Sequence, residues 1–178
     1  LTAQKDAGEH FFKGAQRYCF DYYSGHLMIQ KMGAIKTLCL GDYSLEFGQG
    51  LVAWSSMSFG KSPAVMNLIR KGRGIYRYTS SNEAGFLRGL GSTVRVGDLD
   101  ISAFFSYKPI DANIASTDSL DEVSLVTSFQ ESGYHRTPGE VTDRKAIHEM
   151  VAGSNIKYRG NNYKLGLTYA YYNYNVPL

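Results

Sequence analysis

Residues 162–175 alternate large apolar and small or polar side chains with a period of two. The two faces of this stretch hold Tyr163, Leu165, Leu167, Tyr169 and Tyr171 on one side, and Lys164, Gly166, Thr168 and Ala170 on the other. This period over ten or more residues predicts a strand, longer than the ~5–6 residues usual in globular proteins. Residues 146–159 alternate in the same way, and Gly160-Asn161 between the two stretches predicts a tight hairpin with Lys157 opposite Lys164.

A second predicted hairpin closes at Gly97-Asp98. Its register pairs Val96 with Leu99, Arg95 with Asp100, and Val94 with Ile101. One face is then largely apolar and consists of Phe86, Leu90, Val94, Val96, Leu99, Ile101, Ala103, Phe105 and Tyr107. Phe104 lies opposite Gly91, an arrangement in which an aromatic ring covers a glycine on the neighbouring strand.

A third predicted hairpin has arms at about residues 16–30 and 35–50, with a turn near Met32-Gly33. In the second arm, one face takes the mainly apolar residues and the other the polar ones: Ile35, Thr37, Cys39, Tyr43, Leu45 and Phe47 against Lys36, Asp42, Ser44 and Glu46. The first arm changes phase near Ser24-Gly25, which predicts a β-bulge there.

Short turns within hairpins alternate with long connections between them. Six strands are expected at about residues 16–30, 35–50, 84–96, 99–108, 146–159 and 162–175, with long loops at about 51–83 and 109–145. This alternation is typical of outer-membrane barrels, which have tight periplasmic turns and large outer loops. The tyrosines near strand ends fit the aromatic girdles of such barrels: Tyr107, Tyr158, Tyr163, Tyr169 and Tyr171. We expect an all-β fold, an antiparallel transmembrane β-barrel section over residues 1–178.

Two alternatives to a complete spanning barrel follow from the same pattern. A soluble β-sandwich or lipocalin-like barrel would also alternate, with its apolar face towards a core and its polar face towards water. Six strands also do not close a spanning barrel, since about eight is the smallest known number. Either the chain is one arc of a larger barrel, or part of the protein is absent from this sequence.

Composition narrows the choice of protein class. The 178 residues are 43% hydrophobic, 20% charged and 13% aromatic, which excludes collagen-like, disulfide-scaffold and disordered chains. No stretch approaches the ~18 consecutive apolar residues of a membrane helix. A net charge of +3 is too small to indicate a nucleic-acid binder. The two cysteines, Cys19 and Cys39, form no CxxC pair.

Five sequence blocks carry a resemblance to a known family. They are Gly41-Asp-Tyr-Ser-Leu-Glu-Phe-Gly-Gln-Gly-Leu51, Ser58-Phe-Gly-Lys61, Arg73-Gly-Ile-Tyr-Arg-Tyr-Thr-Ser80, Phe104-Phe-Ser-Tyr-Lys-Pro-Ile-Asp-Ala-Asn113 and Ser132-Gly-Tyr-His-Arg-Thr137. Together they resemble a Bacteroidota outer-membrane family, the helix-hairpin-helix domain-containing proteins, which have a small helical domain followed by a large β-barrel. The resemblance spans nearly the whole chain as an internal section of the barrel and implies location in the outer membrane. The helical domain is not in this sequence, so no DNA-related role is carried over, and the family's molecular function is unassigned.

Candidate catalytic and metal-binding residues form no strong constellation. His10, His26, His135 and His148 are scattered and give no HxxxH or HxH ligand pair. Ser132, His135 and Glu140 lie close in sequence, but no nucleophile elbow accompanies them, and side-chain hydrogen bonds that stabilise a turn explain them equally well. We therefore expect no catalytic activity, no metal and no cofactor.

Charged residues are expected on the lumen face of the barrel. Near the short turns this face is basic, with acidic residues to offset it: Lys36, Arg95, Lys157 and Lys164, against Asp42, Glu46, Asp100 and Glu149. An anion-preferring pore, a salt-bridged plug and a solvated rim all fit this arrangement.

Two charged segments are expected in the outer loops. The first is basic and aromatic, the second acidic: Arg70, Lys71, Arg73, Tyr76, Arg77 and Tyr78, and Asp111, Asp118, Asp121 and Glu122. The acidic segment lacks the ligand spacing and central glycine of a calcium loop, so a solvated surface is favoured. The basic segment would meet anionic lipopolysaccharide or the acidic segment rather than nucleic acid. We expect the two segments to pack together over the outer mouth, as a lid or as a docking surface.

These patterns together predict an outer-membrane protein with a role in transport, assembly or surface scaffolding. Its expected partners are membrane lipid, lipopolysaccharide and other outer-membrane proteins. A surface binding module that acts through its long loops, and a soluble β-domain that binds a hydrophobic ligand, are the alternatives.

Overall fold

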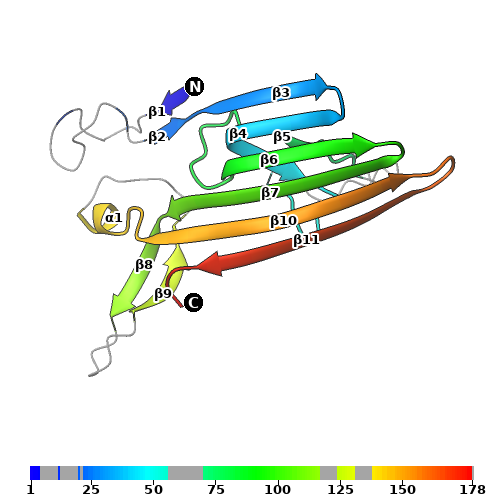
Figure 1. The fold of residues 1–178 in the computed structure, drawn as a ribbon. Helices are drawn as coiled ribbons and strands as arrows, with labels where there is room; N and C mark the ends of the chain where they lie inside the picture. The colour runs from blue at the N-terminus through cyan, green and yellow to red at the C-terminus, as the bar shows by residue number, and fades with distance from the viewer. Residues whose placement is uncertain are drawn as a thin grey trace, which may run out of the picture.

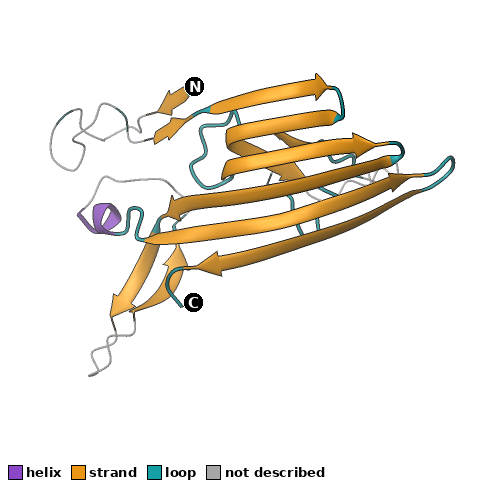
Figure 2. Ribbon diagram, in the orientation of Figure 1, coloured by secondary structure: helices purple, strands orange, loops and turns teal. Residues whose placement is uncertain are grey.

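The computed structural model of the chain describes residues 1–4, 12, 20, 22–55, 70–116, 124–130 and 138–177. In these residues the fold is almost entirely β, with strands β1 to β11 and one short helix, α1 (Figures 1 and 2). No helix within them is long and apolar enough to cross a membrane. The expectation of a mostly β, antiparallel architecture is confirmed.

A seven-stranded antiparallel sheet dominates the structure. Six of its strands follow one another in the order β11-β10-β7-β6-β4-β3, and β5 pairs with β4 as a seventh. The six strands in chain order are β3 (His26–Met32), β4 (Ile35–Glu46), β6 (Leu87–Val96), β7 (Leu99–Ile110), β10 (Ile147–Arg159) and β11 (Lys164–Tyr174). They form the three predicted hairpins, and the strand bounds agree with the sequence pattern to within a few residues, except for the start of the first strand and the end of the second.

The first predicted strand is divided at Gly25. Before it lies β2 (Tyr22–Ser24), which pairs with β1 (Thr2–Gln4) in a separate two-stranded sheet, and after it lies β3. The division falls where the change of phase predicts an irregularity. Residues 16–19 and 21, which the same strand was expected to include, lie outside the described residues.

The long connections contain regular structure that the pattern did not predict. The first includes β5 (Gly74–Arg77). The second includes a separate hairpin of β8 (Ala112–Ser116) and β9 (Ser124–Phe129), followed by α1 (Pro138–Thr142). Figure 1 shows β8 and β9 extending away from the end of β7.

The register of the hairpin at Gly97-Asp98 is confirmed at every predicted pair: Val96 with Leu99, Arg95 with Asp100, and Val94 with Ile101. The register of the last hairpin is shifted, because Arg159 pairs with Lys164 and leaves residues 160–163 as a four-residue connection closed by the Gly160 N–H on Tyr163 O at 2.9 Å. Lys157 therefore lies opposite Gly166, and the predicted apposition of Lys157 and Lys164 is wrong.

The main sheet has two unlike faces. We call the face that carries Phe104 the packed face and the face that carries Phe105 the bare face. The predicted faces of β7, β10 and β11 are confirmed, because the β6–β7 register is as predicted and the β10–β11 register is shifted by two residues, which keeps each side chain on its face. Phe86 departs from its predicted face, since it precedes β6 and is buried with Tyr22 and Tyr78.

The predicted apolar outer face of β4 is wrong from Thr37 onward. Thr37 and Cys39 lie on the packed face, and Tyr43, Leu45 and Phe47 are buried in the core cluster with Phe104. A bulge at Ile35/Thr37 shifts the register by one residue, which exchanges the two faces. Cys39 is consequently fully buried on the packed face, and Leu40 is exposed on the bare face.

Strand β4 turns sharply at Gly41, and its C-terminal half runs behind β6 and β7 in Figure 1. Gly41 has φ +90°, and a β-carbon there would lie 2.3 Å from Gly25 O, so only glycine fits this corner. Beyond it, every residue from Asp42 to Phe47 is buried. The turned-in half of β4 pairs with β5 and packs on the sheet's own packed face in one core cluster: Cys39, Tyr43, Leu45, Phe47, Ala53, Ile75, Phe104 and Val151.

Candidate functional site

The bare face is apolar and exposed over the width of the sheet. Its large exposed side chains are Leu40, Leu90, Val96, Ile101, Phe105, Tyr107, Ile156, Tyr158, Leu165, Leu167, Tyr169 and Tyr171. Leu167, midway along β11, is 72% exposed. On this face, the described strands β6 from Leu90 onward, β7, β10 and β11 carry no Asp, Glu, Lys or Arg. A contiguous apolar surface of this kind is typical of a site that contacts lipid or another protein.

Tyrosines lie towards both ends of the bare face. Tyr107 stacks on His148 at the end near the long connections, with ring centroids 5.2 Å apart. Tyr158 and Tyr163 lie 5.9 Å apart at the short-turn end. Tyrosine is favoured where an apolar surface meets water, because its ring is apolar and its hydroxyl is polar.

Many of the side chains that the sheet directs towards its packed face are small or polar. The turned-in half of β4, together with β5, covers this face. Thr93 and Ser102 share a hydrogen bond of 2.9 Å, and Asn155 donates to Thr168 Oγ1 at 2.8 Å. Ile75 of β5 lies against Gly91, where an added β-carbon would be 3.1 Å from it. These four polar side chains are thus hydrogen-bonded in pairs across neighbouring strands, and apolar side chains from β4 and β5 cover the centre of the face.

Asp100 joins three cations at the short-turn end of the packed face. Lys36 Nζ lies 3.0 Å and Arg95 Nε 2.8 Å from its carboxylate, and Arg159 forms a third ion pair. The sequence placed Lys36, Arg95 and Asp100 on one face, and the structure brings these three together. Arg159 was missed, although its spacing from Lys157 places both on the same face.

Lys157 and Lys164 lie at the same end of the packed face as Asp100. Lys157 is directly opposite Asp100 on β10, and Lys164 is opposite Arg159. In the described part of the chain neither lysine forms an ion pair. This end of the packed face therefore holds five cations around one carboxylate.

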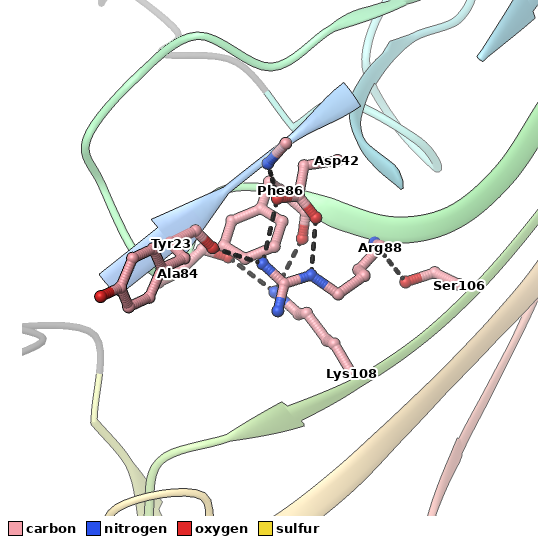
Figure 3. Close-up of polar contacts among 8 residues, drawn as sticks. Tyr23, Asp42, Ala84, Phe86, Arg88, Ser106 and Lys108 are labelled. Carbon is pink, nitrogen blue, oxygen red and sulfur yellow. Dashed lines mark hydrogen bonds and ion pairs between the residues drawn. The ribbon is translucent and has the colours of Figure 1, made fainter. Parts of the chain in front are cut away.

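Asp42 and Glu46, two further expected lumen carboxylates, each pair with an arginine from another element. Arg73 binds Glu46 through Nε at 3.0 Å and Nη2 at 2.7 Å. Arg88 binds Asp42 through Nε at 2.6 Å and Nη2 at 3.0 Å, and the Gly25 N–H also donates to Asp42 at 2.9 Å (Figure 3). Bidentate arginine–carboxylate pairs are specific in geometry as well as in charge. These two pairs therefore hold the Gly41 corner and the turned-in half of β4 in place.

Glu149 lies near the other end of the packed face. It accepts a hydrogen bond from the Tyr174 hydroxyl at 3.2 Å and lies opposite Lys108 of β7.

The expected outer-loop segments have separate partners where the structure describes them. Arg70 donates its N–H to Gln49 at 3.0 Å and lies over Trp54, while Arg73 lies over the Tyr76 ring at 3.7 Å. Of the others in this segment, Lys71 and Arg77 are exposed and Tyr78 is buried. Asp111 accepts a hydrogen bond from the Lys145 N–H at 2.7 Å. Asp118, Asp121 and Glu122 lie outside the described residues, and so do His10, Ser132 and His135.

The described histidines lie on different strands, His26 on β3 and His148 on β10. Within the described residues no group of three or more His, Cys, Asp or Glu side chains is placed to hold a metal ion.

A cavity of about 620 Å³ opens at the end of the sheet opposite the short turns. Arg88 of β6 and Lys108 of β7 line it, together with Tyr172 and Tyr174 of β11 and Phe129 of β9. Beside it, Tyr22 and Tyr78 pack against Phe86, with ring centroids 5.9 Å and 5.1 Å from it. Burial raises the pKa of Tyr22 to about 12 and also raises the pKa of Tyr78, so both phenols stay neutral at physiological pH. Sequence reasoning missed this cavity, because its residues come from seven separate segments of the chain.

The fold and its two faces define an antiparallel β-sheet protein with an apolar bare face and a polar, filled packed face. Comparison of the chain with protein-family models, curated proteins and solved structures gave no match. The resemblance to the Bacteroidota outer-membrane family stays a prediction.

Proposed function

We propose that this chain forms part of the wall of an outer-membrane β-barrel, with its bare face against lipid and its packed face towards a filled interior. The observation that supports this most strongly is the bare face itself, which is apolar, exposed and without Asp, Glu, Lys or Arg along the described strands β6 from Leu90 onward, β7, β10 and β11. A soluble β-domain turns its apolar face inwards and its polar face to water. The exposed apolar bare face supports the proposal, because the wall strands of transmembrane barrels also direct apolar side chains outwards, while a core cluster packs on the other face of this sheet.

The edges of the sheet add a requirement to this proposal. β3 and β11 lie at the two ends of the strand order. Backbone N–H and C=O groups cannot stay unpaired in hydrocarbon, so a spanning wall has no open edge. Further strands must therefore pair with β3 and β11 in the closed wall.

In the proposed orientation the short turns at residues 33–34, 97–98 and 160–163 face the periplasm. The β8–β9 hairpin and α1 then lie on the outer side, near lipopolysaccharide and other outer-membrane proteins. The role is transport, assembly or surface scaffolding rather than catalysis. The resemblance to the Bacteroidota outer-membrane family fits this location.

Two alternatives from other classes remain as proposals. The cavity near the long connections favours a binding module that acts on the cell surface. A soluble domain would instead use the bare face to bind a hydrophobic ligand.

Cell fractionation tests the membrane location. We expect the protein to sediment with the outer membrane, to resist a high-salt wash, and to dissolve only on addition of detergent. A matched outer-membrane barrel and a soluble periplasmic protein, followed in the same fractions, serve as controls. Recovery in the soluble periplasm without detergent would overturn the proposal in favour of the soluble β-domain. Conductance of the purified protein in a planar bilayer would then separate a transport role from a scaffold role.

A further inference from the structure

Lys108 is a buried lysine at the wall of the 620 Å³ cavity, near the end of β7. Only 4% of the residue is exposed. Its ammonium donates to Phe86 O at 2.7 Å and to Ala84 O at 2.9 Å. An ammonium has three donors, so these two carbonyl oxygens leave one donor without an acceptor among the described residues.

No carboxylate in the described residues forms an ion pair with Lys108. Glu149 is opposite Lys108 on β10 but accepts a hydrogen bond from the Tyr174 hydroxyl instead. A buried charge is costly unless a counter-charge and hydrogen bonds offset the loss of water. The two carbonyls supply hydrogen bonds to Lys108 and leave its net charge in place.

Arg88 adds a second cation beside Lys108, and Figure 3 shows both reaching Phe86. The Phe86 ring centroid lies 4.7 Å from Lys108 Nζ and 5.1 Å from Arg88 Cζ. Arg88 already occupies both carboxylate oxygens of Asp42. Asp42 is thus paired with Arg88, while Lys108 faces the cavity with Glu149 opposite it on β10 and, in the described residues, no carboxylate in an ion pair with it.

The rest of the cavity limits what an anion bound there can be. Its lining includes the rings of Phe129, Tyr172 and Tyr174, which suit a flat or apolar body. It also includes three carboxylates, Glu83, Asp111 and Glu149, which would repel a ligand with several negative groups. A cavity of this size matches a small organic molecule.

We propose that this cavity is a binding site for a small organic anion with one carboxylate or phosphate group, which would approach Lys108 while the apolar body lies among the rings. The inference goes beyond the wall role and does not rest on the membrane location. Binding is measured on purified protein, so its failure leaves the fractionation result untouched, and the reverse also holds.

Calorimetric titration of the protein in a non-ionic maltoside detergent tests the site. Phenyl phosphate is the anionic probe and benzyl alcohol the neutral one. We expect saturable binding of phenyl phosphate with a Kd below about 1 mM, and markedly weaker binding of benzyl alcohol. Lys108→Met should weaken phenyl phosphate binding by about tenfold or more, because it removes the buried charge. Lys164→Met, an exposed lysine at the opposite end of the same sheet, should leave it unchanged.

Lys108 also holds two backbone carbonyls, so its replacement by Met carries a risk to folding. Lys145→Gln provides a second variant, because Lys145 is exposed at the cavity and its side chain forms no ion pair in the described residues. We expect it to weaken phenyl phosphate binding about threefold through the loss of long-range attraction. The proposal is overturned if the wild-type protein does not bind phenyl phosphate. It is also overturned if a folded Lys108→Met binds as the wild type does, or if Lys108→Met does not fold and Lys145→Gln binds as the wild type does.

Discussion

The ring of Phe104 on β7 lies against Gly153 on the neighbouring strand β10. A β-carbon added to Gly153 would come within 2.4 Å of Phe104 Cζ and within 2.4 Å of Tyr169 O. Phe47 from the turned-in segment stacks on Phe104, with ring centroids 6.0 Å apart. The absence of a side chain at Gly153 therefore leaves room for the Phe104 ring to lie against β10 and to support Phe47 on the packed face.

Gly153→Ala tests this relationship. Because the new methyl group would meet both a ring and a backbone oxygen, we expect a loss of about 1–3 kcal/mol in the free energy of unfolding. Gly166→Ala on β11 is the matched control, since the nearest atom to its added β-carbon is 3.9 Å away. Urea unfolding in detergent measures both variants. Equal stability of the two would show that Phe104 does not occupy the space at Gly153.

A second prediction concerns the two faces of β11. Leu167→Arg, on the bare face, should impair membrane assembly more than Thr168→Arg on the packed face. A charge that faces hydrocarbon at mid-depth costs ~2–4 kcal/mol, whereas one on the packed face meets polar groups or water. The measurement is the amount of folded protein in the outer membrane. Equal effects, or a stronger effect of Thr168→Arg, would contradict the assignment of the bare face to lipid.

A third prediction concerns the ion-pair cluster at the short-turn end. Asp100→Asn should reduce the free energy of unfolding by roughly 1–3 kcal/mol, because it leaves Lys36, Arg95 and Arg159 without their shared carboxylate. The loss should shrink in high salt, which screens the repulsion among the cations. Asp98→Asn, in the exposed turn two residues earlier, should have little effect. A loss that does not change with salt would point to packing rather than charge.

A fourth prediction concerns the orientation in the membrane. Ser81 and Asn161 are both exposed, in the connection before β6 and in the β10–β11 turn. In a background without Cys19 and Cys39, a cysteine at Ser81 should react with a membrane-impermeant thiol reagent on intact cells. A cysteine at Asn161 should react only after the outer membrane is opened. The reverse result would invert the proposed orientation.

The hairpins could be predicted because, in a strand with one apolar face, apolar side chains recur at every second residue. The predicted pairing of Val96 with Leu99 is right, since a two-residue turn at Gly97-Asp98 allows only one register that keeps the apolar faces of both strands together. The predicted register of the last hairpin is wrong because Gly160-Asn161 matches a two-residue turn in sequence. Only the backbone geometry shows that Asn162 and Tyr163 also belong to the turn.

The interior could not be predicted from the same pattern. The sequence predicts that Phe104 lies opposite Gly91, which is right for the register, but Ile75 and Tyr43 approach Gly91 while the Phe104 ring covers Gly153. Ile75 is distant in sequence, and it reaches Gly91 because β4 turns at Gly41. A single glycine within an alternating stretch does not distinguish a corner from a regular strand position. The ion pairs Asp42–Arg88 and Glu46–Arg73 depend on the same corner, so the charges of these residues could be read from the sequence and their partners could not.

The corner at Gly41 determines what a cell with this protein would present to antibodies. In the proposed orientation, the basic and aromatic segment at residues 70–78 contains β5 and lies on the packed face, inside the proposed barrel, rather than over the cell surface. The β8–β9 hairpin extends away from the end of β7 instead. A serum raised against a peptide of residues 70–78 should therefore stain the denatured protein on a blot and leave intact cells unstained, and an epitope tag meant for display belongs in the β8–β9 hairpin.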